Sequence, residues 1–317
     1  MAVLSSFILF VVSCAVLVYA AGRLIRYLTH LAGYFHLSDF LGAFVIMAFS
    51  TSIPELFVGI NAALAGVPVL ALGTVIGSNI ADLTLVIGVA ALLGRGITIK
   101  NQFIRKDAIF MFFIMLTPLV LFVFDGVLSR IDGLLLLLLF VVYTTHLIKH
   151  RRGLQTSIPN HLRISLTKTI IGFVICLVAL FAGAHFAVIA AESLAIAFAV
   201  PPILIGLFLL ALGTSLPELV FESRAVLAHK ADLAVGDTMG SVVCNSTLVL
   251  GVTALIMPIH ANFMLFLTSG IVMVLVTALF VWFLRSRKGL SVQDALIMVL
   301  LYVFFLLIEF FVRTRIV

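Results

Sequence analysis

The sequence predicts an all-α membrane protein of ten transmembrane helices, arranged as two inverted-topology repeats of five with both termini outside. Three observations lead to this fold class. The chain is 64% hydrophobic and 10% charged, with a mean hydropathy of +1.34, whereas soluble domains are nearer half apolar and a quarter charged. Its apolar runs, such as GLLLLLLFVVY at 133–143, do not alternate with polar residues as barrel strands would. In addition, two polar motifs within apolar helices recur at a constant offset.

Ten apolar segments are each long enough to cross a bilayer as a helix. We predict them, in chain order, at 3–22, 39–64, 68–93, 107–125, 128–148, 168–190, 200–226, 231–257, 261–284 and 293–313. The first segment has no basic residue ahead of its apolar core, so we interpret it as a span and not as a secretory signal peptide. The three cysteines all lie in apolar segments and do not indicate a disulfide framework.

The lysine and arginine residues predict the orientation of these spans. All but three of the 19 fall in the first, third, fifth, seventh and ninth connections or at the span ends that border them. By the positive-inside rule, these connections face the cytoplasm and both termini face outside. The net charge of +6 is therefore explained by topology, and it does not indicate a nucleic-acid partner. The fifth connection, 149–167, is predicted to be a cytoplasmic connector between the repeats.

A pair of motifs, STSIPEL at 50–56 and GTSLPEL at 213–219, marks the repeat. The following segments keep the same spacing, since ALGTVIGSNIADLTLVIG at 71–88 corresponds to AVGDTMGSVVCNSTLVLG at 234–251. Corresponding residues differ by 163 positions, and five helices precede the second copy. An odd number reverses the second copy in the membrane, as in the inverted repeats of secondary transporters. The predicted repeats are 1–148, with its motif region at 42–93, and 168–317, with its motif region at 205–257.

Each motif brings several oxygen ligands to the middle of a helix. Pro54 and Pro217 each remove a backbone N–H, which frees carbonyl oxygens in the preceding turn. Free carbonyls at membrane depth require protein, water or a bound ion as a partner. The Thr-Ser hydroxyls lie on that same turn, and Glu55 and Glu218 follow immediately. Each broken helix is therefore expected to offer carbonyl, hydroxyl and carboxylate oxygens within one or two turns.

The partner helices contribute further oxygens. Ser78 and Asp82 are spaced i and i+4, so they share a helix face, and Ser241 and Asn245 do the same. No cluster of His or Cys accompanies them, which argues against zinc or copper, and all-oxygen sites suit hard cations such as Ca²⁺. Carboxylates in a low-dielectric centre need cations or protons to balance them. We therefore expect the site to change sides only when one set of cations has replaced another.

With these motifs, the sequence resembles the sodium/calcium exchangers of the cation/calcium exchanger superfamily, and in particular their short prokaryotic members. The likeness rests on GTSLPEL, STSIPEL and GSNIAD in inverted halves of five helices. It implies a secondary active antiporter that exchanges Ca²⁺ for Na⁺ by alternating access in a prokaryotic inner or plasma membrane. It implies no enzymatic activity, no cofactor beyond the transported ions and no obligatory protein partner. The ion ligands that it implies are Ala48, Thr51, Ser52, Glu55, Ser78, Asp82, Ala211, Thr214, Ser215, Glu218, Ser241 and Asn245, with backbone carbonyls acting at the two alanines.

Some positions depart from the pattern of that family. The acid of the Asp/Asn pair is Asp82 here, whereas relatives can carry it at the position of Asn245. Two extra acids, Glu222 and Asp237, are expected to line the cytoplasmic approach to the site, although Glu222 could instead pair with Arg224 or bond solvent. They favour an alternative, Ca²⁺/H⁺ antiport on the same fold, while the duplicated Thr-Ser pairs favour Na⁺. An intramembrane aspartyl protease using Asp82 and Asp237 is a further alternative, which leaves the duplication unexplained.

Overall fold

The computed structural model describes residues 2–34, 49, 51–150, 166–198 and 202–313. Within these residues, eight helices are long and apolar enough to cross a membrane, and one bent helix pair would raise the count to nine. The eight are Val3–Leu24, Val69–Leu93, Gln102–Asp125, Arg130–Leu147, Leu166–Ala197, Ala231–Ile256, Phe266–Arg287 and Val292–Glu309, and the bent pair is Ile203–Thr214 with Leu216–Leu227. Each overlaps one predicted span, and the helix Leu166–Ala197 extends beyond the predicted span 168–190. The predicted span 39–64 lies partly outside the described residues, with Ile53–Leu64 as its described helix.

Three of the eight spans, and the bent pair, contain more than one element. In the first half the elements are α1 (Ala2–Tyr34), α3 (Ile53–Leu64), α4 (Val69–Ala81), the π-helix η1 (Asp82–Val86), α5 (Ile87–Leu93), β1 (Ile97–Thr98), α6 (Gln102–Asp125), β2 (Val127–Leu128) and α7 (Arg130–His150). In the second half they are α8 (Leu166–Ala197), α9 (Pro202–Ile205), η2 (Gly206–Leu210), α10 (Ala211–Thr214), α11 (Leu216–Leu227), α12 (Ala231–Val243), η3 (Cys244–Val249), α13 (Leu250–Ile256), β3 (Ile259–His260), α14 (Phe263–Trp282), η4 (Phe283–Arg287), β4 (Gly289–Leu290) and α15 (Val292–Arg313).

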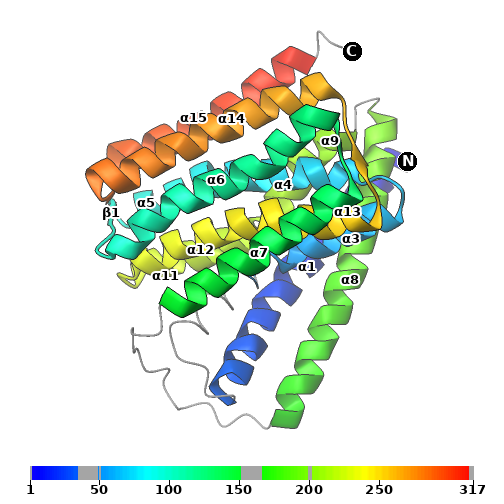
Figure 1. Ribbon diagram of the computed structural model, residues 1–317. Helices are drawn as coiled ribbons and strands as arrows, with labels where there is room; N and C mark the ends of the chain where they lie inside the picture. The colour runs from blue at the N-terminus through cyan, green and yellow to red at the C-terminus, as the bar shows by residue number, and fades with distance from the viewer. Residues whose placement is uncertain (1, 35–48, 50, 151–165, 199–201, 314–317) are drawn as a thin grey trace.

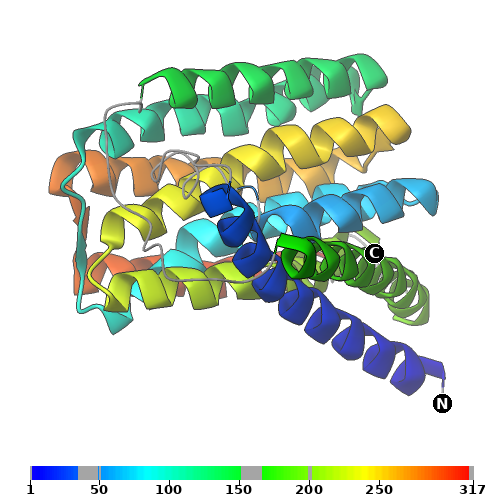
Figure 2. The ribbon, with the colours of Figure 1, turned by 90° about the horizontal axis from the view of Figure 1, so that it is seen from below.

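The helices form two groups that cross at a steep angle. In Figure 1, α1 and α8 run side by side down the lower part of the molecule, while the other long helices lie across them. Figure 2 shows the same neighbouring pair from below, beside α3 and α4. The absence of a side chain at Gly183 allows close packing here, since a Cβ would lie 3.3 Å from the Cγ of Leu17. Small residues at helix contacts are the usual means of close packing in membranes.

Two short strand pairs link the halves. β1 pairs antiparallel with β4, and β2 pairs antiparallel with β3. Moving β1 by 163 positions brings it to within one residue of β3, and moving β2 by the same amount brings it to within one residue of β4. The offset therefore exchanges one strand pair with the other, which is the relation that a pseudo-two-fold axis between two repeats would produce.

The starts of α7 and α15 share the same capping contact. The backbone N–H and the hydroxyl of Ser129 both donate to Oδ2 of Asp132, at 2.8 and 2.7 Å. Ser291 makes the same two bonds to Oδ2 of Asp294, at 3.0 and 2.7 Å. Such reciprocal bonds satisfy orphan N–H groups at a helix start. The motifs SRID and SVQD carried this signal in the sequence, and our sequence analysis missed it.

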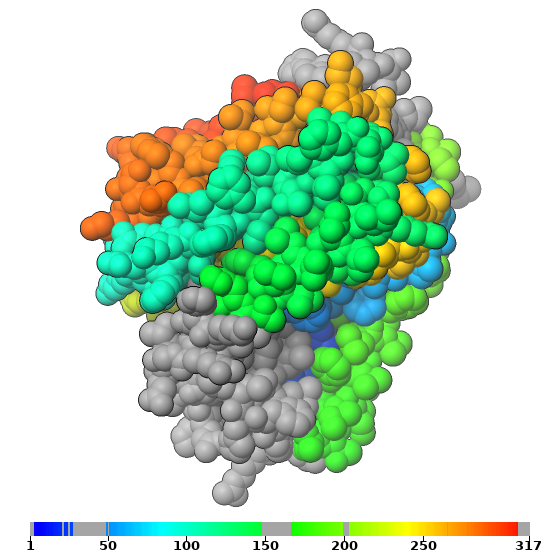
Figure 3. Space-filling model, in the orientation of Figure 1, coloured from blue at the N-terminus to red at the C-terminus, as the bar shows by residue number. Residues whose placement is uncertain are grey.

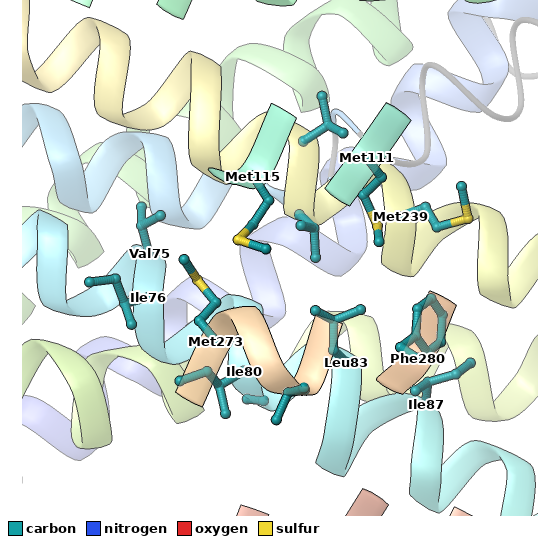
Figure 4. Close-up of a cluster of buried hydrophobic side chains, with 14 of the residues drawn as sticks. Val75, Ile76, Ile80, Leu83, Ile87, Met111, Met115, Met239, Met273 and Phe280 are labelled. Atoms are coloured by element: carbon teal, nitrogen blue, oxygen red, sulfur yellow. The ribbon is translucent and has the colours of Figure 1, made fainter. Parts of the chain in front are cut away.

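A buried apolar cluster fills the space between the broken helices and α6 and α14. Figure 4 shows Met111 and Met115 of α6 on one side and Met273 and Phe280 of α14 on the other. Methionine fills irregular gaps well because its chain is flexible and its sulfur polarizable. This cluster makes the two halves one packed unit around the motif helices.

The outer surface of the described helices is apolar. On the face shown in Figure 3, α6, α7, α14 and α15 form a continuous covering. Large apolar side chains point outward from them, including Phe113 on α6, Leu134 on α7, Leu275 on α14 and Phe304 on α15, which are each more than half exposed. A wide apolar surface of this kind is suited to contact with lipid chains.

Candidate functional site

Both proline motifs break their helices at the same place. α3 begins after Ser52 and α11 begins after Ser215, and these two residues have φ near −81° and −82° with ψ near 2°. Pro54 and Pro217 lie in the first turn, where a missing N–H is tolerated. In the second copy the break bends the span by 41°. The predicted interruption is thus confirmed there, while the preceding turn of the first copy, with Ala48, lies outside the described residues.

The partner helices widen into π-helices at their motif positions. η1 begins at Asp82, and η3 begins one residue before Asn245. Within them, the hydroxyls of Thr84 and Thr247 donate to the carbonyls of the residues four positions earlier, Ile80 and Val243. The two threonines are also 163 positions apart. π-turns frequently occur at functional sites because they reorient the side chains around them, and helical periodicity in the sequence did not reveal these two.

Glycines bring the backbones of the two halves into contact. A Cβ on Gly73 would lie 2.2 Å from the carbonyl oxygen of Ile203, and one on Gly77 would lie 2.2 Å from that of Leu207. From the other side, a Cβ on Gly206 would lie 2.4 Å from the carbonyl oxygen of Leu70. No side chain fits at these distances, so α4 and the segment formed by α9, η2 and α10 pack backbone to backbone, as small-xxx-small faces allow.

Two hydroxyl pairs join the halves at this contact. Oγ1 of Thr51 lies 3.0 Å from Oγ of Ser241. Oγ of Ser78 lies 3.3 Å from Oγ1 of Thr214 and donates to Oε1 of Glu55 at 3.3 Å. The 163-residue offset exchanges one hydroxyl pair with the other. The structure therefore brings together, from four helical segments, hydroxyls that the sequence assigned to one site.

The three predicted carboxylates are buried beside these hydroxyls. Glu55, Asp82 and Glu218 are at most 1% exposed, and Glu55 and Asp82 lie close enough to Glu218 to repel it electrostatically. Both carboxylate oxygens of Asp82 and of Glu218, and both amide atoms of Asn245, lack a hydrogen-bond partner among the described protein atoms. The hydroxyl of Ser215 approaches Asp82 without reaching hydrogen-bond geometry. The oxygen atoms among these groups are available to bind cations.

No basic side chain balances this charge within the described part of the chain, where the buried polar residues include neither Lys nor Arg. No three Asp, Glu, His or Cys side chains converge closely enough in that same part to hold one metal ion. A bound cation would therefore combine few carboxylates with hydroxyl, amide and carbonyl oxygens. Sites of this composition suit Ca²⁺ and Na⁺ better than zinc or copper.

The carbonyl oxygen of Ala211, which the proline break was expected to leave free, accepts two hydrogen bonds in this structure. It accepts the backbone N–H of Ser215 at 3.0 Å and the hydroxyl of Thr214 at 3.3 Å. The same hydroxyl also donates to the carbonyl of Leu210, at 3.0 Å. A cation bound to the Ala211 carbonyl would therefore take the place of the Thr214 hydroxyl, which could turn to become a ligand itself.

Glu222 and Asp237 are both buried from solvent in this structure. Glu222 is 0% exposed and Oε1 accepts the hydroxyl of Thr238 at 2.7 Å, so this acid does not bond solvent. Asp237 is 2% exposed, and Oδ1 accepts the hydroxyl of Thr51 at 3.4 Å. The place of Glu222 near a helix end in the sequence allowed contact with solvent, but α11 and α12 pack against each other and both acids are buried. Asp237 is thus in contact with a predicted ion ligand.

A bundle of apolar helices with unbalanced carboxylates at its centre defines a membrane transporter of cations. The chain belongs to the sodium/calcium exchanger protein family, whose sequence profile matches residues 5–149 and 168–311. This confirms the resemblance, and with it a multi-pass membrane antiporter whose transported ions, and not a cofactor, bind at the site.

Several relatives share most of this chain. It is 30% identical over 282 residues to the inner membrane protein YrbG of Escherichia coli, covering 86% of each chain. It is 26% identical over 351 residues to the sodium/calcium exchanger MaX1 of Methanosarcina acetivorans, covering 97% of this chain and 99% of that one. A solved structure of the sodium-calcium exchanger NCX_Mj, soaked with 100 mM Na⁺ and 10 mM Sr²⁺, superposes with a TM-score of 0.67 at 25% identity, covering 95% and 97%.

Proposed function

We propose that this protein exchanges Ca²⁺ for Na⁺ by alternating access, as a secondary active antiporter. The proposed architecture is ten transmembrane helices in two inverted repeats of five, 1–148 and 168–317, joined by a cytoplasmic connector at 149–167, with both termini outside. The exchange of the two strand pairs, and of the two hydroxyl pairs, by one sequence offset supports the inverted repeats. The concentration of basic residues in alternate connections supports the orientation.

A single observation carries the functional proposal. Glu55, Asp82 and Glu218 are buried together where the halves meet, and among the described residues some of their oxygens have no hydrogen-bond partner and no Lys or Arg is buried. Isolated charges at membrane depth are too costly to persist without cations or protons. The proposed ligands are the side-chain oxygens of Thr51, Ser52, Glu55, Ser78, Asp82, Thr214, Ser215, Glu218, Ser241 and Asn245, together with the carbonyls of Ala48 and Ala211.

Exchange follows from this charge balance. One Ca²⁺ or several Na⁺ would neutralise most of the cluster, whereas the cluster without cations would carry unbalanced charge through the apolar core. The loaded forms can therefore move between the two faces, and the empty form cannot. The hydroxyl and carbonyl oxygens around the carboxylates suit Na⁺ as the exchanged ion, because they bind it without needing a change of protonation.

Ca²⁺/H⁺ antiport on the same fold is the second candidate. The observation that favours it is the burial of two further acids, Glu222 and Asp237, beside the predicted ligands. Protons on these acids could supply the counter-charge that Na⁺ supplies in the leading proposal.

Transport by the purified protein in liposomes distinguishes the two candidates. Ca²⁺ uptake would be driven by an outward Na⁺ gradient in one set of vesicles and by an outward proton gradient in another. We expect uptake with Na⁺ alone, and its loss in Glu55→Gln, while Glu192→Gln on α8 serves as a control that leaves the site intact. Uptake with protons alone would replace Na⁺ by H⁺ as the coupling ion. Absence of uptake under both gradients would show that Ca²⁺ is not the substrate.

A further inference from the structure

The charge at the centre of this protein is larger than the predicted ligands account for. Five acids are buried there in all, since Glu222 and Asp237 join Glu55, Asp82 and Glu218. Asp237 lies close enough to Glu218, and Glu222 close enough to Asp82, for the like charges to repel. One Ca²⁺ neutralises only two carboxylates, so three would stay unbalanced in a region where the described residues include no buried Lys or Arg. Such an imbalance calls for further positive charge at the two extra acids.

Among the described residues, only one of the two carboxylate oxygens of Glu222 has a hydrogen-bond partner. Its Oε1 accepts the hydroxyl of Thr238 at 2.7 Å, and that threonine lies on α12, opposite Glu222 on α11. Its Oε2 is fully buried and has no hydrogen-bond partner within the part of the chain that the structure describes. A buried carboxylate oxygen without a donor is costly, because it has lost water and gained nothing in exchange.

Asp237 faces the same region from the neighbouring position on α12. Oδ1 accepts the hydroxyl of Thr51, and Oδ2 is buried with no partner among the residues described. Asp237 directly precedes Thr238, the partner of Glu222, so its carboxylate lies close enough to Glu222 to repel it electrostatically. Two carboxylates that repel each other, each with one unsatisfied oxygen, are therefore held together by the packing of α11 on α12.

We propose that Glu222 and Asp237, with the hydroxyl of Thr238, form a second subsite that binds a Ca²⁺ ion next to the motif site. This inference rests on the proposed transport of Ca²⁺ and extends it to a second ion. Ca²⁺ fits better than Na⁺, because a pair of carboxylates carries two negative charges and a single Na⁺ would leave one of them unbalanced. Ca²⁺ also accepts carboxylates in mono- or bidentate geometry, with roughly six to eight oxygens in a flexible shell.

The test is the number of Ca²⁺ ions bound per chain, measured by equilibrium binding of radioactive Ca²⁺ to the purified protein in lipid nanodiscs without Na⁺. We expect about two ions for the wild type and about one for Glu222→Gln. The control Glu192→Gln makes the same chemical change at a partly buried acid of α8 that is not a proposed ligand, and it should still bind about two. Thr238→Val keeps both acids and removes only the hydroxyl, so it should weaken the second binding event by about tenfold, as the loss of a hydrogen bond to a charged group predicts.

Two outcomes would overturn the subsite. If the wild type and Glu222→Gln both bind about one ion, the pair of acids is balanced in another way, such as by a shared proton, and holds no Ca²⁺. In that case Na⁺-driven uptake by the wild type would leave the proposed function standing. If the wild type binds no Ca²⁺ and shows no uptake, the subsite and the proposed function are both wrong. Should Glu222→Gln fail to fold, the Thr238→Val titration decides alone, and an unchanged second binding event would contradict the proposal.

Discussion

Gly77→Ala perturbs the contact between the two halves without removing any proposed ligand. The added Cβ would lie 2.2 Å from the carbonyl oxygen of Leu207 and 2.6 Å from the Cβ of Ala211. Ordinary contact begins at 3.4 Å, so α4 must move by about 1.2 Å, since a helix carbonyl cannot turn aside by itself. Ser78 follows directly in the chain, and its 3.3 Å separation from Thr214 would then exceed hydrogen-bond distance.

The expected cost follows from these distances. Overpacking of a tight contact costs about 1–3 kcal/mol, and each 1.4 kcal/mol is a factor of about ten in an equilibrium constant. Because the oxygens from the two halves must close around one ion, we expect Ca²⁺ to bind about 5- to 150-fold more weakly to Gly77→Ala. Na⁺-driven uptake should fall in parallel at low Ca²⁺ and recover partly at high Ca²⁺.

Ca²⁺ affinity and initial uptake rates would be measured for Gly77→Ala beside Gly22→Ala. Gly22 lies on α1 with no atom within 4 Å of the position of an added Cβ, so this change should leave both quantities unaltered. Thermal unfolding would show that both variants are folded. Wild-type affinity and uptake in Gly77→Ala would refute the reasoning, because they would mean that the close backbone contact does not position the oxygens.

Two other predictions concern the symmetry of the halves. Asp82→Asn should weaken Ca²⁺ binding by about 10- to 100-fold through loss of a charged ligand. Adding Asn245→Asp should restore most of the affinity, because the offset exchanges the two positions. A double variant that binds as weakly as the single one would show that the position of the charge matters and not its total. Ser129→Ala and Ser291→Ala should each lower the free energy of unfolding by about 0.5–2 kcal/mol through loss of a helix cap, with no effect on Ca²⁺ affinity. Thermal denaturation in detergent measures this change. An unchanged melting temperature would contradict the prediction.

The sequence alone predicted the class and the ingredients of the site. Spans were recognisable because the bilayer requires about 20 apolar residues per helix, a property that is read from the chain without knowledge of neighbours. The two Pro-Glu motifs were recognisable because a proline inside a helix has a local consequence, and the break at Ser215 appears where it was predicted. The spacing of Ser78 and Asp82 likewise placed both on one helix face.

Tertiary structure decided which of these groups meet and which are buried. Glycines such as Gly73 and Gly77 leave room for a close contact but do not identify its partner, which proved to be the carbonyls of Ile203 and Leu207. Glu222 and Asp237 were expected nearer the cytoplasmic surface, because position along a helix does not reveal which neighbour covers its end. Sequence periodicity shows only how a helix is divided between apolar and polar faces. Which faces pair depends on the distances between segments more than a hundred residues apart. Those distances are set only when the two halves pack together.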